Sequence, residues 1–348
     1  MIRRLVVAAG AAAVPAAIAG VLLRRGTDRL LGAPRVLPEE STLGPRLDSL
    51  GGEVVRIRSR DGLRLSGRWL PAVESTSGDD WRPDPYEAIL LLHGWSGSVA
   101  PDVVEFAPFL RKTAGVLALD FRGHGESDPS PTTFGLREID DVAGALAWLG
   151  ERGIRRVCLL GTSMGGITAI ASTVVLGDGR LAGADVDVDA PRAPEPAPRP
   201  LIAGIVAESV PPELAVIVRN RLSGPFRGVV ADMLFASVAR RLGSDPREME
   251  PIRIIGLVGV PVLLIHGDAD DTVPLADGRR LAEAAGARTE RWVVTGAMHS
   301  GAHAADPAGY EERVTSFLRR ALTETRAILA ASHDRKPARR RARRVVND

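Results

Sequence analysis

Short apolar runs alternate along this chain with longer segments whose apolar residues recur at helical spacing. The runs occupy residues 88–92, 115–119, 156–160, 201–207, 260–265 and 291–294. Continuous apolar runs of this kind predict strands that are buried on both faces, as in parallel sheets. The alternation of such strands with helices predicts right-handed βαβ units. We therefore expect an α/β fold with a mostly parallel sheet and helices on both of its faces.

The remaining segments complete the predicted order of elements. Residues 54–58 and 63–70 are rich in β-forming residues, and Asp61-Gly62 between them predicts a hairpin. Prolines recur between residues 191 and 200, so we expect an extended connector over residues 177–200. Residues 210–256 have helical periodicity but are long for a connection, which predicts a small helical lid. Helices are predicted over residues 103–111, 136–149, 164–176, 275–285 and 307–331.

Composition excludes several classes of protein. Of the 348 residues, 45% are apolar and 25% are charged, which excludes a fibrous, a wholly disordered and a polytopic membrane chain. Cys158 is the single cysteine, so the chain has neither an internal disulfide nor a metal site built from several cysteines. A folded body of about 300 residues buries enough surface to be stable without such cross-links.

Positive charge is concentrated at the two ends of the chain. Residues 1–34 carry a net charge of +4 and residues 335–348 carry +6, whereas the whole chain carries +2, which leaves −8 for the residues between them. The high isoelectric point is therefore a property of the ends and does not favour a nucleic-acid-binding body. The basic C-terminal segment lacks interleaved aromatic residues and any recognition motif, so we expect no nucleic-acid partner.

Residues 5–23 form a stretch of 19 residues without a charge, bracketed by Arg3-Arg4 and Arg24-Arg25. This length is just sufficient to span a bilayer as a helix, so we expect an N-terminal membrane anchor within residues 1–34. Two alternatives stay open: a signal peptide with its cleavage site at Ala17-Ile18-Ala19, and a soluble alanine-rich helix. Arginines after the stretch slightly outweigh the positive charges before it, which favours a cytoplasmic body.

The C-terminal residues 332–348 are basic and are predicted to form a disordered tail. If the body is cytoplasmic, the tail lies near an anionic leaflet, where each basic charge contributes about 1 kcal/mol of attraction. Contact with a membrane surface through both basic ends and a solvated tail are two interpretations that the sequence leaves open.

The sequence Gly161-Thr162-Ser163-Met164-Gly165 lies between the predicted strand 156–160 and the predicted helix 164–176. A nucleophilic serine at such a junction needs a tight turn with unfavourable dihedral angles, so small residues must lie two positions away on each side. The turn raises the hydroxyl above the sheet and places it at a helix N-terminus, where developing negative charge is stabilised. The pattern therefore predicts Ser163 as a nucleophile.

Five motifs, in this order, resemble those of the α/β-hydrolase superfamily. They are His93-Gly94-Trp95-Ser96-Gly97, Asp120-Phe121-Arg122-Gly123-His124-Gly125-Glu126-Ser127, the serine motif at 161–165, His266-Gly267-Asp268-Ala269-Asp270-Asp271-Thr272-Val273-Pro274 and Gly296-Ala297-Met298-His299-Ser300. The chain is most similar to small-lid acyl hydrolases of the lysophospholipase, monoacylglycerol-lipase and membrane-tethered esterase kind. The resemblance implies an α/β-hydrolase domain over residues 52–331 with the lid at residues 210–256.

The resemblance also implies the roles of three residues. Ser163 is the expected nucleophile, and His299, which follows the last strand, is the expected general base. Asp270 is the expected acid because it fits the family pattern His-Gly-x-x-Asp-x-x-Val-Pro. Alternative acids are Asp268, Asp271 and, because some family members place the acid there, Glu208.

Two backbone amides form the oxyanion hole of this family. The residue after the nucleophile supplies one, here Met164, and the residue after His-Gly on the third strand supplies the other, here Trp95. His93, His124 and His266 recur in the motifs as residues that fix loops rather than as catalysts.

The implied reaction is hydrolysis of a carboxylic ester or thioester through an acyl-enzyme intermediate, with no cofactor and no metal. The expected partner is a small-molecule or lipid acyl ester. Two other interpretations stay open: an amide or peptide hydrolase with the same triad, and a non-catalytic protein that retains the fold. His303 lies four residues after His299, but the sequence offers no third ligand that would complete a metal site.

Overall fold

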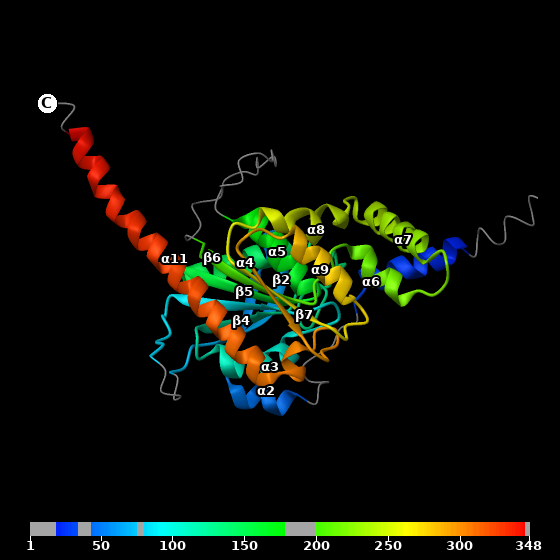
Figure 1. Ribbon diagram of the computed structural model, residues 1–348, viewed down its shortest axis with the longest axis horizontal. Coiled ribbons are helices and arrows are strands. Elements are labelled where there is room, and N and C mark those ends of the chain that lie inside the picture. Colours follow the sequence, from blue (N-terminus) through cyan, green and yellow to red (C-terminus); the bar gives the residue numbers. More distant parts are fainter. Residues whose placement is uncertain (1–18, 34–42, 75–79, 178–198, 345–348) are drawn as a thin grey trace, which may run out of the picture.

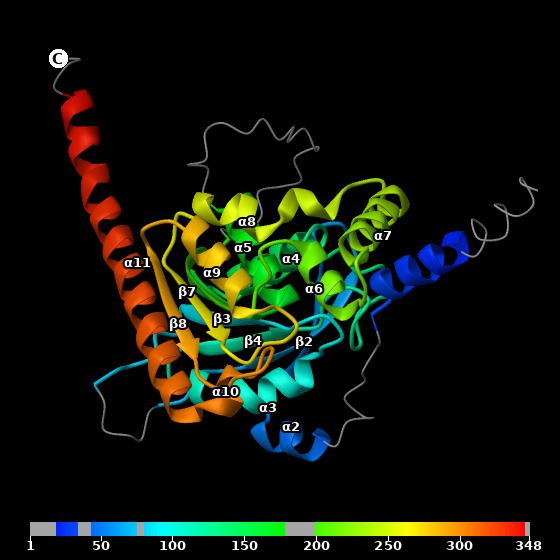
Figure 2. The ribbon, with the colours of Figure 1, turned by 45° about the vertical axis from the view of Figure 1, so that its right-hand side comes forward.

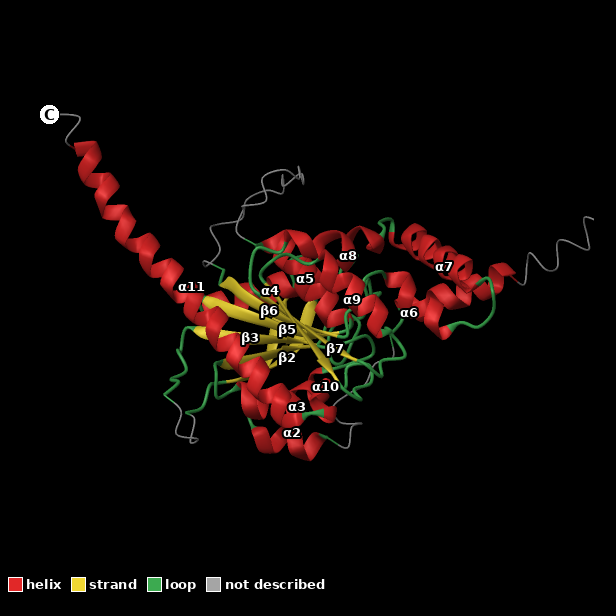
Figure 3. Cartoon of the chain, in the orientation of Figure 1, coloured by secondary structure: helices red, strands yellow, loops and turns green. Residues whose placement is uncertain are grey.

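The computed structural model of the chain describes residues 19–33, 43–74, 80–177 and 199–344. A central sheet is covered by helices on both faces, so the body has three layers (Figure 1). Figure 3 shows the strands running side by side through the middle of the body, with helices above and below them. The predicted α/β class is therefore confirmed.

Eight strands within the described residues form one sheet in the order β1-β2-β4-β3-β5-β6-β7-β8. They are β1 (Glu53–Arg58), β2 (Arg64–Leu70), β3 (Glu87–Leu92), β4 (Gly115–Leu119), β5 (Arg156–Thr162), β6 (Leu201–Glu208), β7 (Val262–Gly267) and β8 (Thr289–Val294). β2 pairs antiparallel with both β1 and β4, whereas all the other neighbouring strands are parallel. The sheet is mostly parallel, as predicted.

The helices divide between the two faces of the sheet. One face is covered by α2 (Gly44–Leu50), α3 (Val99–Leu110), α10 (Ala302–Ala305) and α11 (Pro307–Arg344). The other is covered by α4 (Glu138–Glu151), α5 (Met164–Leu176), α8 (Pro251–Ile254) and α9 (Leu275–Ala284). The predicted lid segment contains α6 (Leu214–Arg221), α7 (Arg227–Leu242) and α8, with the short 3-10 helix η2 (Pro246–Met249) between α7 and α8; a second, η3 (Ile255–Leu257), follows α8.

Side chains of the central strands alternate between two apolar cores. Leu90 and Leu92 of β3 pack in the core beneath α4 and α5, whereas Ile89 and Leu91 pack in the core beneath α3 and α11. Every residue of β3, β4, β5 and β7 is buried. Because both faces of these strands are covered, consecutive positions must be apolar, and this explains the continuous runs in the sequence.

Two helix boundaries differ by more than two residues from those predicted. α3 begins at Val99 rather than at residue 103, because Val99 N donates a hydrogen bond of 2.8 Å to Asp120 Oδ1 and the carboxylate caps the helix. α11 continues to Arg344 rather than ending at residue 331, so it includes most of the segment predicted as a disordered tail. Alanine and arginine are abundant in that segment, and both are strong helix formers.

The N-terminal part of the described chain is a helix over residues 19–31. It lies beside α7, and α11 lies on the opposite side of the body (Figure 2). The predicted membrane anchor over residues 5–23 lies outside the described residues apart from residues 19–23, and the predicted connector lies almost wholly outside them. Among the helices that the structure describes, none has both the length and the apolar character that crossing a membrane requires.

Candidate active site

Ser163 lies on the turn between β5 and α5 with a φ of +50° and a ψ of −113°. A positive φ is rare for a residue that carries a side chain and costs about 1–3 kcal/mol. The flanking glycines allow the chain to pack this closely: a Cβ at Gly161 would overlap the backbone of Gly165, and a Cβ at Gly165 would overlap Leu92 O. Backbone crowding therefore requires glycine at both positions of the motif.

His299 follows β8 and reaches across the edge of the sheet to Ser163. Its Nε2 lies 3.0 Å from Ser163 Oγ. Two hydrogen bonds fix its loop to the end of β6: Ser300 N donates to Ser209 Oγ at 3.0 Å, and Ala302 N donates to Glu208 Oε1 at 2.9 Å. The structure thus brings together two of the predicted residues, which are 136 positions apart in the chain.

Asp270 lies on the loop after β7 and faces the other nitrogen of His299. Its Oδ2 accepts a hydrogen bond of 2.9 Å from His299 Nδ1, and its Oδ1 accepts from Val273 N at 2.8 Å and from Thr272 N at 3.0 Å. Burial acts to raise the pKa of Asp270, but the hydrogen bonds from His299 and Val273 outweigh burial and hold the pKa below its usual value. The carboxylate is therefore ionised at neutral pH and keeps the Nδ1 proton on His299.

The alternative acids occupy other positions. Asp268 Oδ1 accepts a hydrogen bond of 2.6 Å from Gly296 N, and Asp271 is exposed. The buried carboxylate of Glu208 accepts from Ala302 N at 2.9 Å and from Tyr310 Oη at 3.1 Å, and burial raises its pKa to about 6. Asp268 and Glu208 therefore fix the two ends of the loop that carries His299, and Asp270 bonds to the imidazole itself.

Trp95 and Met164 lie on the two backbone segments that meet at Ser163. A Cβ at Gly94 would lie 3.6 Å from Ser163 Cβ, which shows how closely the loop after β3 approaches the serine. Within the described part of the chain, neither Trp95 N nor Met164 N has a hydrogen-bond acceptor. Met164 is the first residue of α5, where a backbone amide has no partner inside the helix. Both amides are therefore available to an oxygen atom bound beside Ser163.

His93 fixes the loop that carries Trp95. Its Nδ1 donates to Gly94 O at 2.8 Å, and its Nε2 accepts from Phe121 N at 3.0 Å. Burial, together with the nearby His124, lowers the pKa of His93 to about 3, so the ring is neutral and can hold both bonds. His93 is thus a structural link between the loops after β3 and β4, as its motif predicts.

The profile of the alpha/beta hydrolase family matches residues 89–313, which include Ser163, Asp270 and His299. The chain belongs to this family. It is similar to the uncharacterized protein YfhR of Escherichia coli O157:H7, with 25% identity over 249 residues that cover 70% of this chain and 71% of YfhR. It is also similar to the uncharacterized protein Rv2307c of Mycobacterium tuberculosis, with 28% identity over 283 residues, 80% of this chain and 81% of that protein.

A solved structure with the same fold is the esterase Pf2001 of Pyrococcus furiosus. Its TM-score is 0.59 at 24% sequence identity, and the match covers 83% of this chain and 99% of the esterase. This likeness shows that the chain has the same fold as the esterase. The family match supports a hydrolase activity for this chain.

The α/β-hydrolase has a pocket of about 660 Å³ over Ser163 and His299. Its wall is mostly apolar and includes Phe134 and Ile167 from the body and Leu214, Ile217, Val218, Leu222, Leu234 and Phe235 from the lid segment. A cavity of this size with apolar walls and few polar groups is typical of a small-molecule site.

The helix over residues 19–31 also contributes to the pocket, which the sequence does not indicate. Gly26, Arg29 and Leu30 line the cavity. Thr132 N donates a hydrogen bond of 2.8 Å to Leu31 O and ties the end of this helix to the body. From sequence, the uncharged stretch that overlaps the start of this helix predicts a membrane span. No motif in that stretch predicts a contact with the body.

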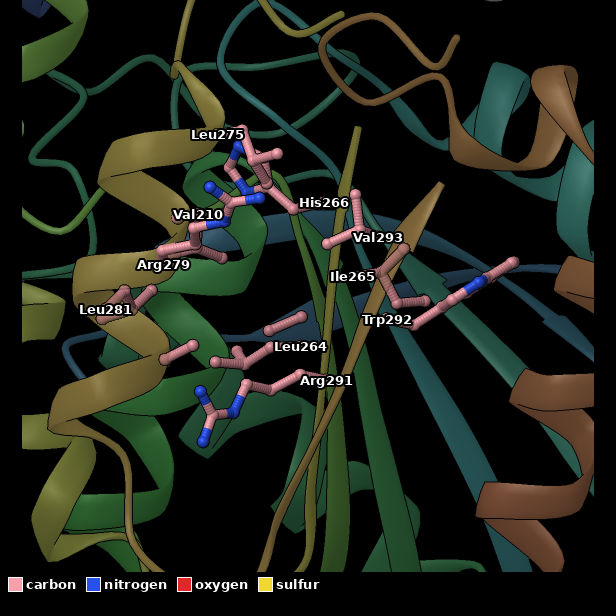
Figure 4. Close-up of a pocket in the computed structure, with 13 residues that line it drawn as sticks. Val210, Leu264, Ile265, His266, Leu275, Arg279, Leu281, Arg291, Trp292 and Val293 are labelled. Carbon is pink, nitrogen blue, oxygen red and sulfur yellow. The ribbon is translucent and has the colours of Figure 1, made fainter. Parts of the chain in front are cut away.

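A second, much smaller cavity lies between α9 and the strands β7 and β8 (Figure 4). Its volume of about 60 Å³ equals that of about two water molecules. Figure 4 shows His266 near Leu275 at one end of the cavity and Leu264 farther along it. His266 Nε2 donates to Val273 O at 2.7 Å and so fixes the loop that carries Asp270. The cavity is too small for an ester substrate, and His266 has a structural role.

Proposed function

We propose that this α/β-hydrolase cleaves carboxylic esters or thioesters with Ser163 as nucleophile, His299 as general base and Asp270 as the acid that orients His299. One observation carries the proposal: hydrogen-bond distances of 3.0 and 2.9 Å connect Ser163 Oγ to His299 and His299 to Asp270. A serine hydroxyl is a weak nucleophile at neutral pH and needs a base within this reach.

The first step is attack of Ser163 Oγ on the carbonyl carbon of the ester. His299 Nε2 accepts the hydroxyl proton as the new C–O bond forms, and Asp270 stabilises the imidazolium that results. The carbonyl oxygen becomes an oxyanion and takes hydrogen bonds from Trp95 N and Met164 N. The imidazolium then donates its proton to the leaving alcohol or thiol, and an acyl-Ser163 ester remains.

The second step reverses these roles with water as the nucleophile. His299 removes a proton from water, the hydroxide attacks the acyl carbon, and the same two amides stabilise the second oxyanion. Collapse of this intermediate breaks the bond to Ser163 Oγ, which regains its proton from His299. Acid and free serine are the products, so the reaction consumes one water and needs no cofactor.

The pocket supports an ester with an apolar acyl group as the substrate. Most of its wall is apolar, and α6 and α7 of the segment 210–256 supply much of that wall. We therefore propose that residues 210–256 act as the lid of the site. Burial of the acyl chain against this wall contributes about 0.8 kcal/mol for each methylene group, which favours esters of medium chain length over acetate.

A fluorophosphonate probe and a chromogenic ester test the proposal. Ser163→Ala is expected to lose labelling and to lower turnover by about 10⁶-fold, because no other group supplies the nucleophile. Ser172→Ala is the matched control: it removes a buried hydroxyl from α5, the helix that follows Ser163, and that hydroxyl has no hydrogen-bond partner among the described residues. Absence of labelling in the folded parent chain contradicts the proposal, and so does full turnover by Ser163→Ala.

A further inference from the structure

The helix α7 has apolar residues on two faces. Its buried face consists of Ala231, Leu234, Phe235 and Val238, which pack against the body. A second set is exposed: Phe226, which immediately precedes the helix, and Val229, Val230 and Met233 on it are 72, 59, 40 and 50% accessible. The exposed residues have spacings of 3, 1 and 3 positions, so they form one stripe along the helix. A lid helix that packs on the body needs only the first face, and the second is unexplained by the fold.

The helix over residues 19–31, which lies beside α7, carries two more exposed apolar side chains. Val21 and Leu22 are 52 and 61% exposed near its start. The helix packs directly on α7, because Gly26 lies against Leu234 and Asp28 forms an ion pair of 2.8 Å with Arg241. Both helices lie at the same end of the molecule in Figures 1 and 2. We call the exposed stripe of α7 together with Val21 and Leu22 the apolar face.

Basic side chains surround the apolar face. Arg24 and Arg25 follow Leu22, Arg221 ends α6 just before α7, and Arg240 lies seven positions after Met233, in line with the stripe. All four are exposed, and none forms an ion pair with a described residue. Of the acidic neighbours, Asp28 is paired with Arg241, whereas Asp232, next to Met233 on α7, is exposed and forms no ion pair with a described residue, so it offsets one of the four positive charges. This concentration of free positive charge contrasts with the rest of the body, which is net negative.

We propose that the apolar face binds the surface of a bilayer that contains anionic lipids. Apolar side chains flanked by arginines match both layers of such a surface, since the former enter the acyl boundary and the latter contact anionic headgroups. The sequence supports the same orientation: residues 5–18, which directly precede this helix, carry no charge. A water-soluble protein partner explains the exposed apolar stripe on α7. It does not explain why the residues that precede the neighbouring helix, 5–18, carry no charge.

Docking in this orientation brings the proposed active site to the membrane. Gly26, Arg29 and Leu30 from one helix and Arg221, Leu222 and Leu234 from the lid segment line the pocket over Ser163. The elements that contact the bilayer are therefore also the walls of the pocket, and an ester dissolved in the bilayer has a short path to the serine. The docking itself requires no catalysis, so it stands or fails independently of the proposed reaction.

A local fluorescence measurement on the full chain tests the proposal. Cys158 is fully buried, so Val229→Cys supplies a selective position for an environment-sensitive dye, and Ile328→Cys on α11 is a matched exposed position on the opposite side. With phosphatidylcholine vesicles that contain phosphatidylglycerol, the emission of the dye at position 229 is expected to shift to the blue, and that at position 328 is not. Arg221→Gln and Arg240→Gln should each raise the lipid concentration at half-maximal shift about fivefold.

Three results overturn the proposal. One is co-sedimentation of the chain with vesicles while the dye at position 229 keeps its aqueous emission, because the residues before Ala19 then hold the chain without the apolar face. Another is a blue shift that grows with protein concentration in the absence of lipid, because the face is then an interface between copies of this chain. The third is an equal shift on vesicles of phosphatidylcholine alone that is insensitive to both arginine substitutions, because anionic headgroups then have no part in binding.

Discussion

The substitution Asp270→Asn tests the orientation of the imidazole without removing any side-chain volume. Asp270 Oδ1 accepts hydrogen bonds from Val273 N and Thr272 N, at 2.8 and 3.0 Å. An asparagine must keep its amide oxygen toward these two donors, so its NH₂ group faces His299 Nδ1. Nδ1 must then accept a hydrogen bond, and the single ring proton moves to Nε2, which faces Ser163. The imidazole in this tautomer cannot accept the proton of the serine.

The expected loss is therefore large, although smaller than the loss expected for Ser163→Ala. The corresponding change in a serine protease of unrelated fold lowers kcat about 10⁴-fold, or about 5.5 kcal/mol of transition-state stabilisation, and we expect a loss of this order here. The assay is kcat/KM on a chromogenic ester near neutral pH, with the rate of fluorophosphonate labelling as a second readout. A thermal melt checks that the variant is folded.

Asp268→Asn is the matched control on the same loop. Asp268 Oδ1 accepts from Gly296 N, and an asparagine oxygen at that position accepts the same bond, so turnover is expected to stay within a few fold of the parent. The reasoning is refuted if folded Asp270→Asn keeps more than about a tenth of the parent activity, a loss smaller than about 1.4 kcal/mol. A larger loss in Asp268→Asn than in Asp270→Asn refutes it as well.

Two further predictions concern stability. Burial raises the pKa of Glu208 from 4.5 to about 6, so the unfolded chain loses this proton first as the pH rises. The free energy of unfolding should therefore fall by about 1.5 kcal/mol between pH 4.5 and pH 6.5 on account of this group, and urea denaturation of Glu208→Gln should lack that part of the fall. Gly165→Ala places a Cβ against Leu92 O and should lower the free energy of unfolding by about 1–3 kcal/mol or prevent folding. Gly228→Ala in exposed α7, where a Cβ meets open space, should raise it by up to about 1 kcal/mol, and equal melting temperatures for these two variants contradict the argument.

The sheet was predictable from sequence because strands that are buried on both faces require an unbroken run of apolar residues. β4 has no polar position along its length, and in β3 only the first residue, Glu87, is polar, so the apolar runs nearly coincide with the strands themselves. The arrangement of Ser163, Asp270 and His299 was predictable for a different reason. Each follows a strand of the parallel part of the sheet, and the carboxyl ends of those strands meet along one edge.

Contacts between distant polar residues were not predictable in the same way. Helical periodicity places Asp141 on a helix surface or among its capping contacts, but its side chain is 0% exposed and bonds Arg122, itself 1% exposed, at 2.7 Å. Burial raises the pKa of Asp141 to about 7 against the opposing effect of this guanidinium. No local pattern distinguishes a carboxylate that faces water from one that faces an arginine 19 residues earlier in the chain.

The position of the helix over residues 19–31 has a practical consequence for how this hydrolase is produced. A shortened chain that starts at residue 34 is the obvious choice for removing the uncharged N-terminal stretch. Such a chain also loses Gly26, Arg29 and Leu30, which line the pocket. On the proposed mechanism we expect its serine to remain reactive toward small phosphonates, whereas the acyl group of a larger substrate is expected to face solvent where the helix stood. Substrate preferences measured on that shortened protein would describe an opened pocket, whereas a chain that starts at residue 20 keeps the three residues of this helix that line the pocket.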